Sequence, residues 1–155
     1  MKNLLFLLLL ISSVTFAQDY RNTDAVEINY FKGNIYAHSP EMAHLTTGHP
    51  EGLMVSWNKK THGNQEWQSL YNNPDYGAYF LYQNLKNEVL GDTYAVGGFY
   101  NFYFFKRNLV FKISEGIALT TNPYDQENNY KNNAFGTKFL ANINFGLNYS
   151  RENLF

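Results

Sequence analysis

The stretch FGTKFLANINFGLNYS, residues 135–150, alternates between two kinds of side chain. Its odd positions are mostly large and apolar, whereas its even positions are mostly asparagine, glycine and other small or polar residues. Successive side chains of a β-strand point to opposite faces, so this stretch predicts one strand with an apolar face and a polar face. Strands of soluble proteins average about 5–6 residues. A strand of this length is typical of a large curved sheet or a barrel.

Five earlier segments show the same period. Residues 92–105 and 109–121 are long and are joined by a predicted tight turn at 106–108, and the shorter candidates are residues 28–37, 52–59 and 76–83. The one helical turn that we expect, near residues 66–71, is too short for a crossover connection, so consecutive strands should pair antiparallel. The sequence therefore predicts an all-β, antiparallel, up-and-down sheet of about six strands.

Two positions disturb the pattern of these strands. Gly97 and Gly98 lie in the middle of a predicted strand, where glycine often marks a bend or a bulge. Glu115 falls on the apolar face of segment 109–121. Either a bulge at residues 114–116 turns its side chain away, or that face is not fully in contact with lipid or core.

The composition excludes several classes of protein. Aromatic residues make up 18% of the chain and charged residues only 16%, against about 25% charged in ordinary globular domains, so a disordered, highly charged protein is excluded. The net charge is −1 and no basic run is long, which argues against a nucleic-acid partner. The absence of cysteine excludes disulfides, thiolate zinc sites and cysteine nucleophiles.

The first seventeen residues are typical of a secretory signal peptide. Lys2 gives a positive start, residues 4–11 form an apolar run, and small residues lead to Ala17. A membrane-spanning helix needs about 20 apolar residues, so the run is too short for an anchor. We expect cleavage after Ala17, which leaves residues 18–155 as one exported domain.

Two architectures are compatible with export and long alternating strands. Outer-membrane β-barrels use strands of about 9–11 residues with apolar side chains outward, polar side chains inward and aromatic girdles at both interfaces. Trp57 and Trp67 would then be interfacial anchors, or alternatively platforms for carbohydrate stacking. A secreted soluble β-sandwich is the alternative. Three segments are longer than usual sandwich strands and favour the barrel, and because such barrels have at least eight strands, we expect an incomplete barrel with about six of eight.

Several motifs resemble one family of bacterial enzymes. They include Gly48-His49-Pro50 and, most specifically, Asn122-Pro123-Tyr124-Asp125 followed by Asn132-Asn133-Ala134. This series, over roughly residues 28–149, resembles the acyloxyacyl hydrolase or lipid A 3-O-deacylase family in its Bacteroidetes-type form. The resemblance implies an eight-stranded outer-membrane barrel that hydrolyses an ester-linked acyl chain of lipid A in lipopolysaccharide without a cofactor. It also implies a serine nucleophile and a histidine base in a His-x-Ser motif on a late strand.

That motif is missing from the chain. None of the four histidines, His38, His44, His49 and His62, is followed at the second position by serine. We therefore expect the His-x-Ser motif to lie beyond Phe155, the chain to be the N-terminal portion of the family's barrel, and this chain alone to be inactive. A non-catalytic lipid- or glycan-binding barrel is the alternative function. His44, His49 and Glu51 match no spacing of a zinc site, so no metal is expected.

The remaining candidate residues are polar. Asn122, Tyr124 and Asp125 are expected either to build a turn or to contact the substrate, since asparagine, proline and aspartate also favour turns. Asn142 and Asn144 are expected to point into the barrel lumen. The predicted partners are lipid A and the outer membrane.

Overall fold

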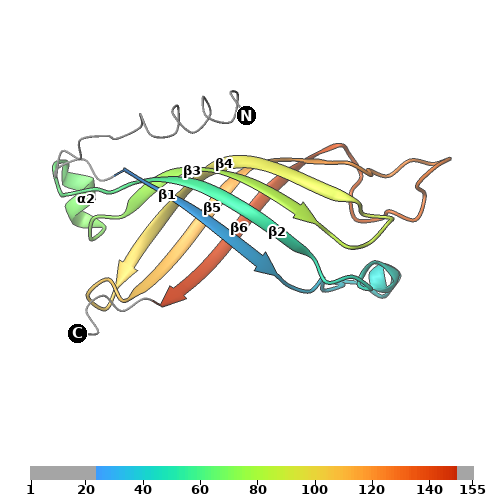
Figure 1. Cartoon of the computed structure of the whole chain (residues 1–155), viewed down its shortest axis with the longest axis horizontal. Coiled ribbons are helices and arrows are strands. Elements are labelled where there is room, and N and C mark those ends of the chain that lie inside the picture. The colour runs from blue at the N-terminus through green and yellow to red at the C-terminus, as the bar shows by residue number, and fades with distance from the viewer. Residues whose placement is uncertain (1–23, 150–155) are drawn as a thin grey trace, which may run out of the picture.

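The computed structural model describes residues 24–149 as one six-stranded sheet (Figure 1). The strands are β1 (Asp24–Lys32), β2 (Glu51–Lys59), β3 (Asp75–Asn84), β4 (Asp92–Phe104), β5 (Leu109–Thr120) and β6 (Phe139–Tyr149). Each pairs antiparallel with the next in sequence. This confirms the all-β, up-and-down prediction, and the single sheet differs from the two facing sheets of a sandwich. The predicted cleavage site at Ala17 and the end of the chain lie outside the described residues.

Two short helices lie between the strands. The α-helix α2 (Glu66–Leu70) lies where the sequence predicts a helical turn. The 3-10 helix η1 (Pro40–Leu45) was not predicted, because its length is too short to show a helical period. Among the described residues, no helix is long and apolar enough to cross a membrane.

Two strand boundaries differ from the predictions. Strand β6 begins at Phe139 rather than Phe135, because Phe135 packs against a separate cluster of Leu45, Leu85 and Leu90 beneath the connectors. Strand β1 occupies residues 24–32 rather than 28–37. The chain leaves the sheet at Gly33, whose N–H donates to the carbonyl of Pro50 at 2.8 Å.

The bulge predicted as one alternative at Gly97 and Gly98 is absent. Gly97 pairs with Gly116 and Gly98 with Glu115 in a register that continues unbroken on both sides. The reason for glycine is instead close approach, since a Cβ on Gly97 would lie 2.7 Å from both Gly116 Cα and Tyr79 Cε1. With no bulge to turn it, Glu115 stays on the outer face opposite Ile143.

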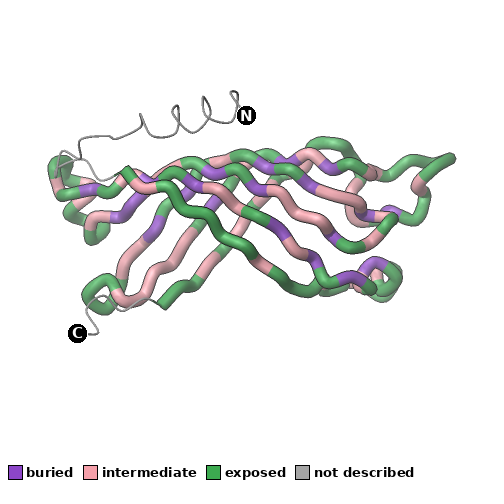
Figure 2. The backbone as a smooth tube through the Cα atoms, in the orientation of Figure 1, coloured by how far each residue is buried: buried purple, intermediate pink, exposed green. Residues whose placement is uncertain are grey.

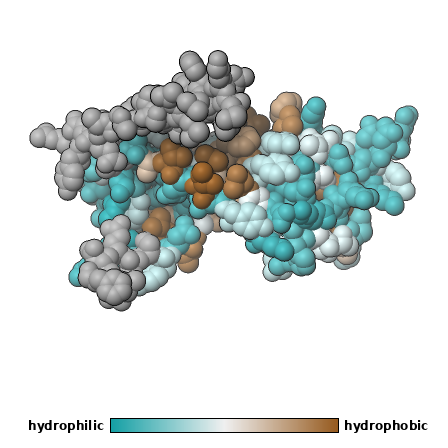
Figure 3. Space-filling view, in the orientation of Figure 1, coloured by the Kyte–Doolittle hydropathy of each residue, from teal (hydrophilic) through white to brown (hydrophobic). Residues whose placement is uncertain are grey.

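The sheet is curved and has two different faces (Figure 2). The inner face carries a buried cluster of Tyr79, Leu81, Ala95, Phe99 and Ala118, against which Phe31, Met54 and Leu140 pack. The outer face exposes many large apolar side chains, including Ile28, Val96, Ile117, Ile143 and Phe145, each more than half exposed. Figure 3 shows hydrophobic side chains gathered over the strands and hydrophilic ones over the connectors.

The two adjacent glycines give a direct test of this geometry. We expect Gly97→Ala to lower the free energy of unfolding by about 1–3 kcal/mol, because the added methyl group overpacks the contact with Gly116 and Tyr79. Gly98→Ala is the matched control, since its Cβ would meet only the Gly77 carbonyl oxygen, at 3.5 Å. Urea titration followed by tryptophan fluorescence in detergent measures both, and equal losses would contradict the close-approach explanation.

Candidate functional site

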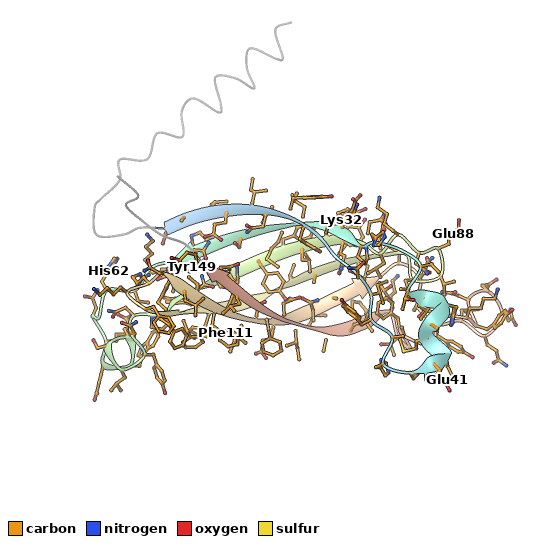
Figure 4. All side chains as sticks on the ribbon, turned by 90° about the horizontal axis from the view of Figure 1, so that it is seen from below. Lys32, Glu41, His62, Glu88, Phe111 and Tyr149 are labelled. Atoms are coloured by element: carbon orange, nitrogen blue, oxygen red, sulfur yellow. The ribbon has the colours of Figure 1, made fainter. Side chains whose placement is uncertain are left out.

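The two ends of the sheet differ in their connectors. Residues 33–50, 85–91 and 121–138 join strands at one end, here called the loop end, and residues 60–74 and 105–108 join them at the other, the turn end. Figure 4 shows Lys32, Glu41 and Glu88 near the loop end and His62 and Tyr149 near the turn end. Any functional site must therefore use the loop end, the turn end, or one of the two faces between them.

On the outer face, the register arranges side chains in rows of changing chemistry. The middle row is apolar and consists of Ile28, Val55, Phe80, Val96, Ile117 and Ala141. The next row toward the loop end is largely aromatic and consists of Tyr30, Leu53, Tyr82, Tyr94, Leu119 and Phe139. The row beyond it, here called the polar rim, is Lys32, Glu51, Asn84 and Asp92. Within three rows the outer face thus passes from aliphatic to aromatic to charged.

The aromatic row and the polar rim are linked by hydrogen bonds. The Tyr30 hydroxyl donates to Glu51 Oε2 at 3.0 Å, and the Tyr82 hydroxyl donates to Asp92 Oδ2 at 3.2 Å. Lys86, in the next connector, places its Nζ 2.7 Å from Glu51 Oε1. In both tyrosines the ring therefore lies beside apolar side chains of the same row, and the hydroxyl is hydrogen-bonded to a carboxylate of the polar rim.

A second group of aromatic side chains lies at the turn end. Trp67 on α2, Tyr76 on β3, and Tyr100 and Phe102 on β4 form a chain with ring centroids 6.1–6.4 Å apart. Trp67, Tyr100 and Phe102 also line an outer hollow of about 390 Å³ with Tyr71 and Pro74. Trp57 lies on the outer side of β2 and is 42% exposed. The outer face therefore carries aromatic side chains at both ends.

The connectors at the loop end are held together by asparagine side chains. Asn132 is fully buried, and its Nδ2 donates to the carbonyl oxygens of Asn122 at 2.5 Å and Val89 at 3.3 Å. Its Oδ1 accepts from the N–H groups of Ala134 and Phe135 at 3.1 and 3.0 Å. One side chain thus joins two connectors, which explains an asparagine at this place in the motif.

The three candidate residues of the motif Asn122-Pro123-Tyr124-Asp125 lie in the connector of residues 121–138. Asn122 donates to the carbonyl of Glu88 at 2.8 Å, and Tyr124 is exposed. Asp125 accepts from the N–H groups of Asn128 and Glu127, and these donors hold the pKa of its carboxyl below the ordinary value. The contacts of Asn122 and Asp125 are those of a structured turn.

The histidines are not arranged as a catalytic pair. His44 Nε2 lies 2.8 Å from the carbonyl oxygen of Lys131, and His49 Nδ1 lies 2.8 Å from Asn34 Oδ1. Within residues 24–149, no histidine ring is hydrogen-bonded to a serine or threonine hydroxyl. The same part of the chain holds no cluster of three histidine, aspartate or glutamate side chains that could bind a metal ion.

Asn142 and Asn144 lie on the inner face of the sheet, on the same side as Tyr79. Asn142 Oδ1 accepts from the Tyr79 hydroxyl at 2.7 Å and from Asn144 Nδ2 at 2.8 Å. Asn142 is therefore hydrogen-bonded both to Asn144 and to a buried tyrosine. The bond to Tyr79 links β6 to β3 across the inner face of the sheet.

Sequence reasoning missed a polar cluster at the turn end of the inner face. Asp75 is buried and accepts a hydrogen bond from the Tyr103 hydroxyl, while Arg107 Nη2 lies 3.5 Å from Asp75 Oδ1 and its guanidinium stacks on the Tyr103 ring at 3.6 Å. These residues border a hollow of about 430 Å³ that Asn58, Asn101 and Lys112 also line. No local motif joins these residues, because only the sheet register brings them together.

The asparagine network predicts a local effect of one substitution. We expect Asn132→Ala to leave the sheet folded but to make residues 121–138 sensitive to protease, because it removes the acceptor of the Ala134 and Phe135 N–H groups and one of the two amide donors to the Val89 and Asn122 carbonyls. Limited proteolysis with mass spectrometry locates the cleavage. Asn133→Ala is the matched control, since Asn133 makes a single exposed bond to the Glu41 carbonyl. Equal protection of both variants would contradict the assignment.

Comparison with known proteins gives one match. The family model for lipid A 3-O-deacylase (PagL) matches residues 51–155. No curated protein and no solved structure gives a significant match. The match covers strands β2 to β6, the polar rim from Glu51 onward and the asparagine network, and it agrees with the resemblance of the sequence motifs. Because the matched residues make up more than half of the chain, this protein belongs to the lipid A 3-O-deacylase (PagL) family.

Proposed function

We propose that this protein lies in the bacterial outer membrane as part of a β-barrel and serves the hydrolysis of ester-linked acyl chains of lipid A. The observation that carries the proposal is the layered outer face. A middle row of apolar, mostly exposed side chains lies between the aromatic row near the loop end and the aromatic group at the turn end, which is the pattern of a strand surface in contact with lipid. Membership of the lipid A deacylase family supplies the substrate class.

The connectors suggest which end faces outward. Outer-membrane barrels have short turns on the periplasmic side and longer loops on the extracellular side. Between the described strands, the two longest connectors, residues 33–50 and 121–138, lie at the loop end, whereas the turn end has residues 60–74 and the shortest connector, residues 105–108. We therefore assign the loop end, with its polar rim, to the cell surface, where lipid A has its headgroup.

Hydrolysis needs groups that the described sheet does not bring together. A serine nucleophile requires a base within hydrogen-bond reach and donors for the developing oxyanion. His44 contacts a backbone carbonyl and His49 a side-chain amide instead, and the chain has no His-x-Ser sequence. We therefore assign this sheet to holding the lipid at the barrel wall, and we propose that catalysis requires a His-x-Ser strand outside residues 1–155.

A lipid- or glycan-binding barrel without catalysis is the second candidate. The hollow lined by Trp67, Tyr71, Tyr100 and Phe102 favours it, because exposed aromatic rings can stack on sugar. The two functions differ in one measurable respect, which is the release of fatty acid by the family's complete barrel.

The face assignment can be tested on β6. We expect Ile143→Arg to prevent stable insertion, because Ile143 is 61% exposed on the outer face and a charged side chain on a lipid-facing position costs about 2–4 kcal/mol near the midplane. Asn144→Arg is the matched neighbour on the inner face and should still fold. Heat-modifiable mobility in detergent compares the two, and the reverse order would refute the assigned faces.

The catalytic assignment gives a separate prediction. Purified residues 18–155 should release no fatty acid from lipid A, because no histidine in the described part of the chain has a hydroxyl partner. Chromatography of released hydroxy fatty acids measures this directly. Clear release that disappears in His44→Ala or His49→Ala would show that the active site lies within this chain.

A further inference from the structure

We propose that Lys32 and Lys86, placed on either side of Glu51 at the polar rim, bind a phosphate group of the lipid headgroup. The inference deepens the proposed function and rests on it for the position of the rim at the membrane surface. It concerns recognition of the lipid and not the chemical step.

The sheet register places two cations around one carboxylate. Lys32 on β1 stands directly opposite Glu51 on β2, and cross-strand partners have Cβ atoms about 4.5–5.5 Å apart. Lys86 approaches Glu51 from the connector after β3, with its Nζ 2.7 Å from Oε1. Lys86 is thus ion-paired with Glu51, and Lys32 stands beside the same carboxylate on the neighbouring strand, so this part of the rim holds two cations and one anion.

On the side of Lys86 that faces β4, two further carboxylates, Glu88 and Asp92, line a hollow together with Lys86. Asp92 is separated from Glu51 by Asn84 and is occupied by the hydroxyl of Tyr82. The side of the rim formed by β1 and β2 is therefore positive, and the side formed by β4 is negative. An anionic headgroup is attracted to the first side and repelled by the second.

The depth of the two lysines fits a phosphate. Lys32 lies one row beyond Tyr30, and Lys86 lies in the connector that follows Asn84, one row beyond Tyr82; tyrosine rings favour the headgroup level of a membrane. Lysines just outside that level carry their charge into water while their methylene stems cover apolar surface. Acyl chains lying on Ile28, Val55 and Phe80 would then place their headgroup against Lys32 and Lys86.

The backbone of Lys86 is held in place before any ligand binds. Lys86 has a φ of 52°, and its N–H donates to Asn84 Oδ1 at 2.8 Å. Gly48 packs against the same turn so closely that a Cβ there would lie 2.7 Å from the carbonyl oxygen of Leu85. A fixed backbone lowers the conformational entropy that ligand binding would otherwise cost.

Binding of lipid A to the full chain in neutral detergent tests the inference, with variants of opposite expected sign. Lys32→Gln and Lys86→Gln should each weaken binding of bisphosphorylated lipid A about fivefold at low salt, which is the effect of about one lysine at a membrane surface. Glu51→Gln should strengthen binding, because it releases Lys86 from its ion pair, removes the carboxylate opposite Lys32 and keeps an oxygen acceptor for Tyr30. Lys59→Gln is the matched control, since Lys59 lies on the outer face of β2, the strand of Glu51, but at its turn end.

The ligand arms separate the possible outcomes. Dephosphorylated lipid A should bind all variants equally, and inorganic phosphate should compete with the bisphosphorylated form. The inference is overturned if Glu51→Gln weakens binding as much as the lysine variants, if Lys59→Gln has the same effect as they do, or if lysine-dependent binding is seen with inorganic phosphate and not with lipid A. Fatty-acid release is not part of this measurement, so a failure of hydrolysis would count against the proposed function alone.

Discussion

The unbroken antiparallel register of the six strands is the constraint on which the rest of the structure depends. Because side chains alternate with a period of two, a slip of one residue would move every outer side chain of a strand to the inner face. The register aligns Ile28, Val55 and Phe80 in one apolar row and sets Lys32 beside Glu51. The layered outer face and the charged rim therefore follow from the same backbone hydrogen bonds.

Asparagine has different roles in the sheet and in the connectors. On the inner face Asn142 and Asn144 pair with one another and with Tyr79, which fills a space between strands with satisfied polar groups. In the connectors, the side chains of Asn122, Asn129 and Asn132 donate hydrogen bonds to backbone carbonyls that lie outside the strands. The loop end is thus ordered by side-chain hydrogen bonds and by a small apolar cluster around Leu45.

The period of the sequence was sufficient to predict the strands, but it could not predict what only tertiary contacts decide. Phe135 continues the alternation of β6, yet its ring packs against the apolar cluster beneath the connectors. The strand therefore starts later than the pattern indicates. Gly97 and Gly98 look alike in sequence, and only the neighbours of Gly97 on β5 and β3, Glu115, Gly116 and Tyr79, distinguish the packed glycine from the open one. The alternation of β6 was sufficient to predict that Asn142 and Ile143 lie on opposite faces, whereas the grouping of Lys32, Glu51 and Lys86 was not predictable, because it needs the register and a turn together.

Glu115 shows how the outer face accommodates a departure from its own pattern. Glu115 lies on β5, in the row next to the apolar middle row. Its partners in the register are Gly98 on β4 and Ile143 on β6. Gly98 presents no side chain and Ala78 beyond it only a methyl group, so the carboxylate borders open space on one side rather than a large apolar group. Aspartate and glutamate also cost less than arginine or lysine on a lipid-facing strand. The charged side chain on this face is therefore a carboxylate, and it lies beside small residues, so it lowers the stability of the fold less than a basic residue there would.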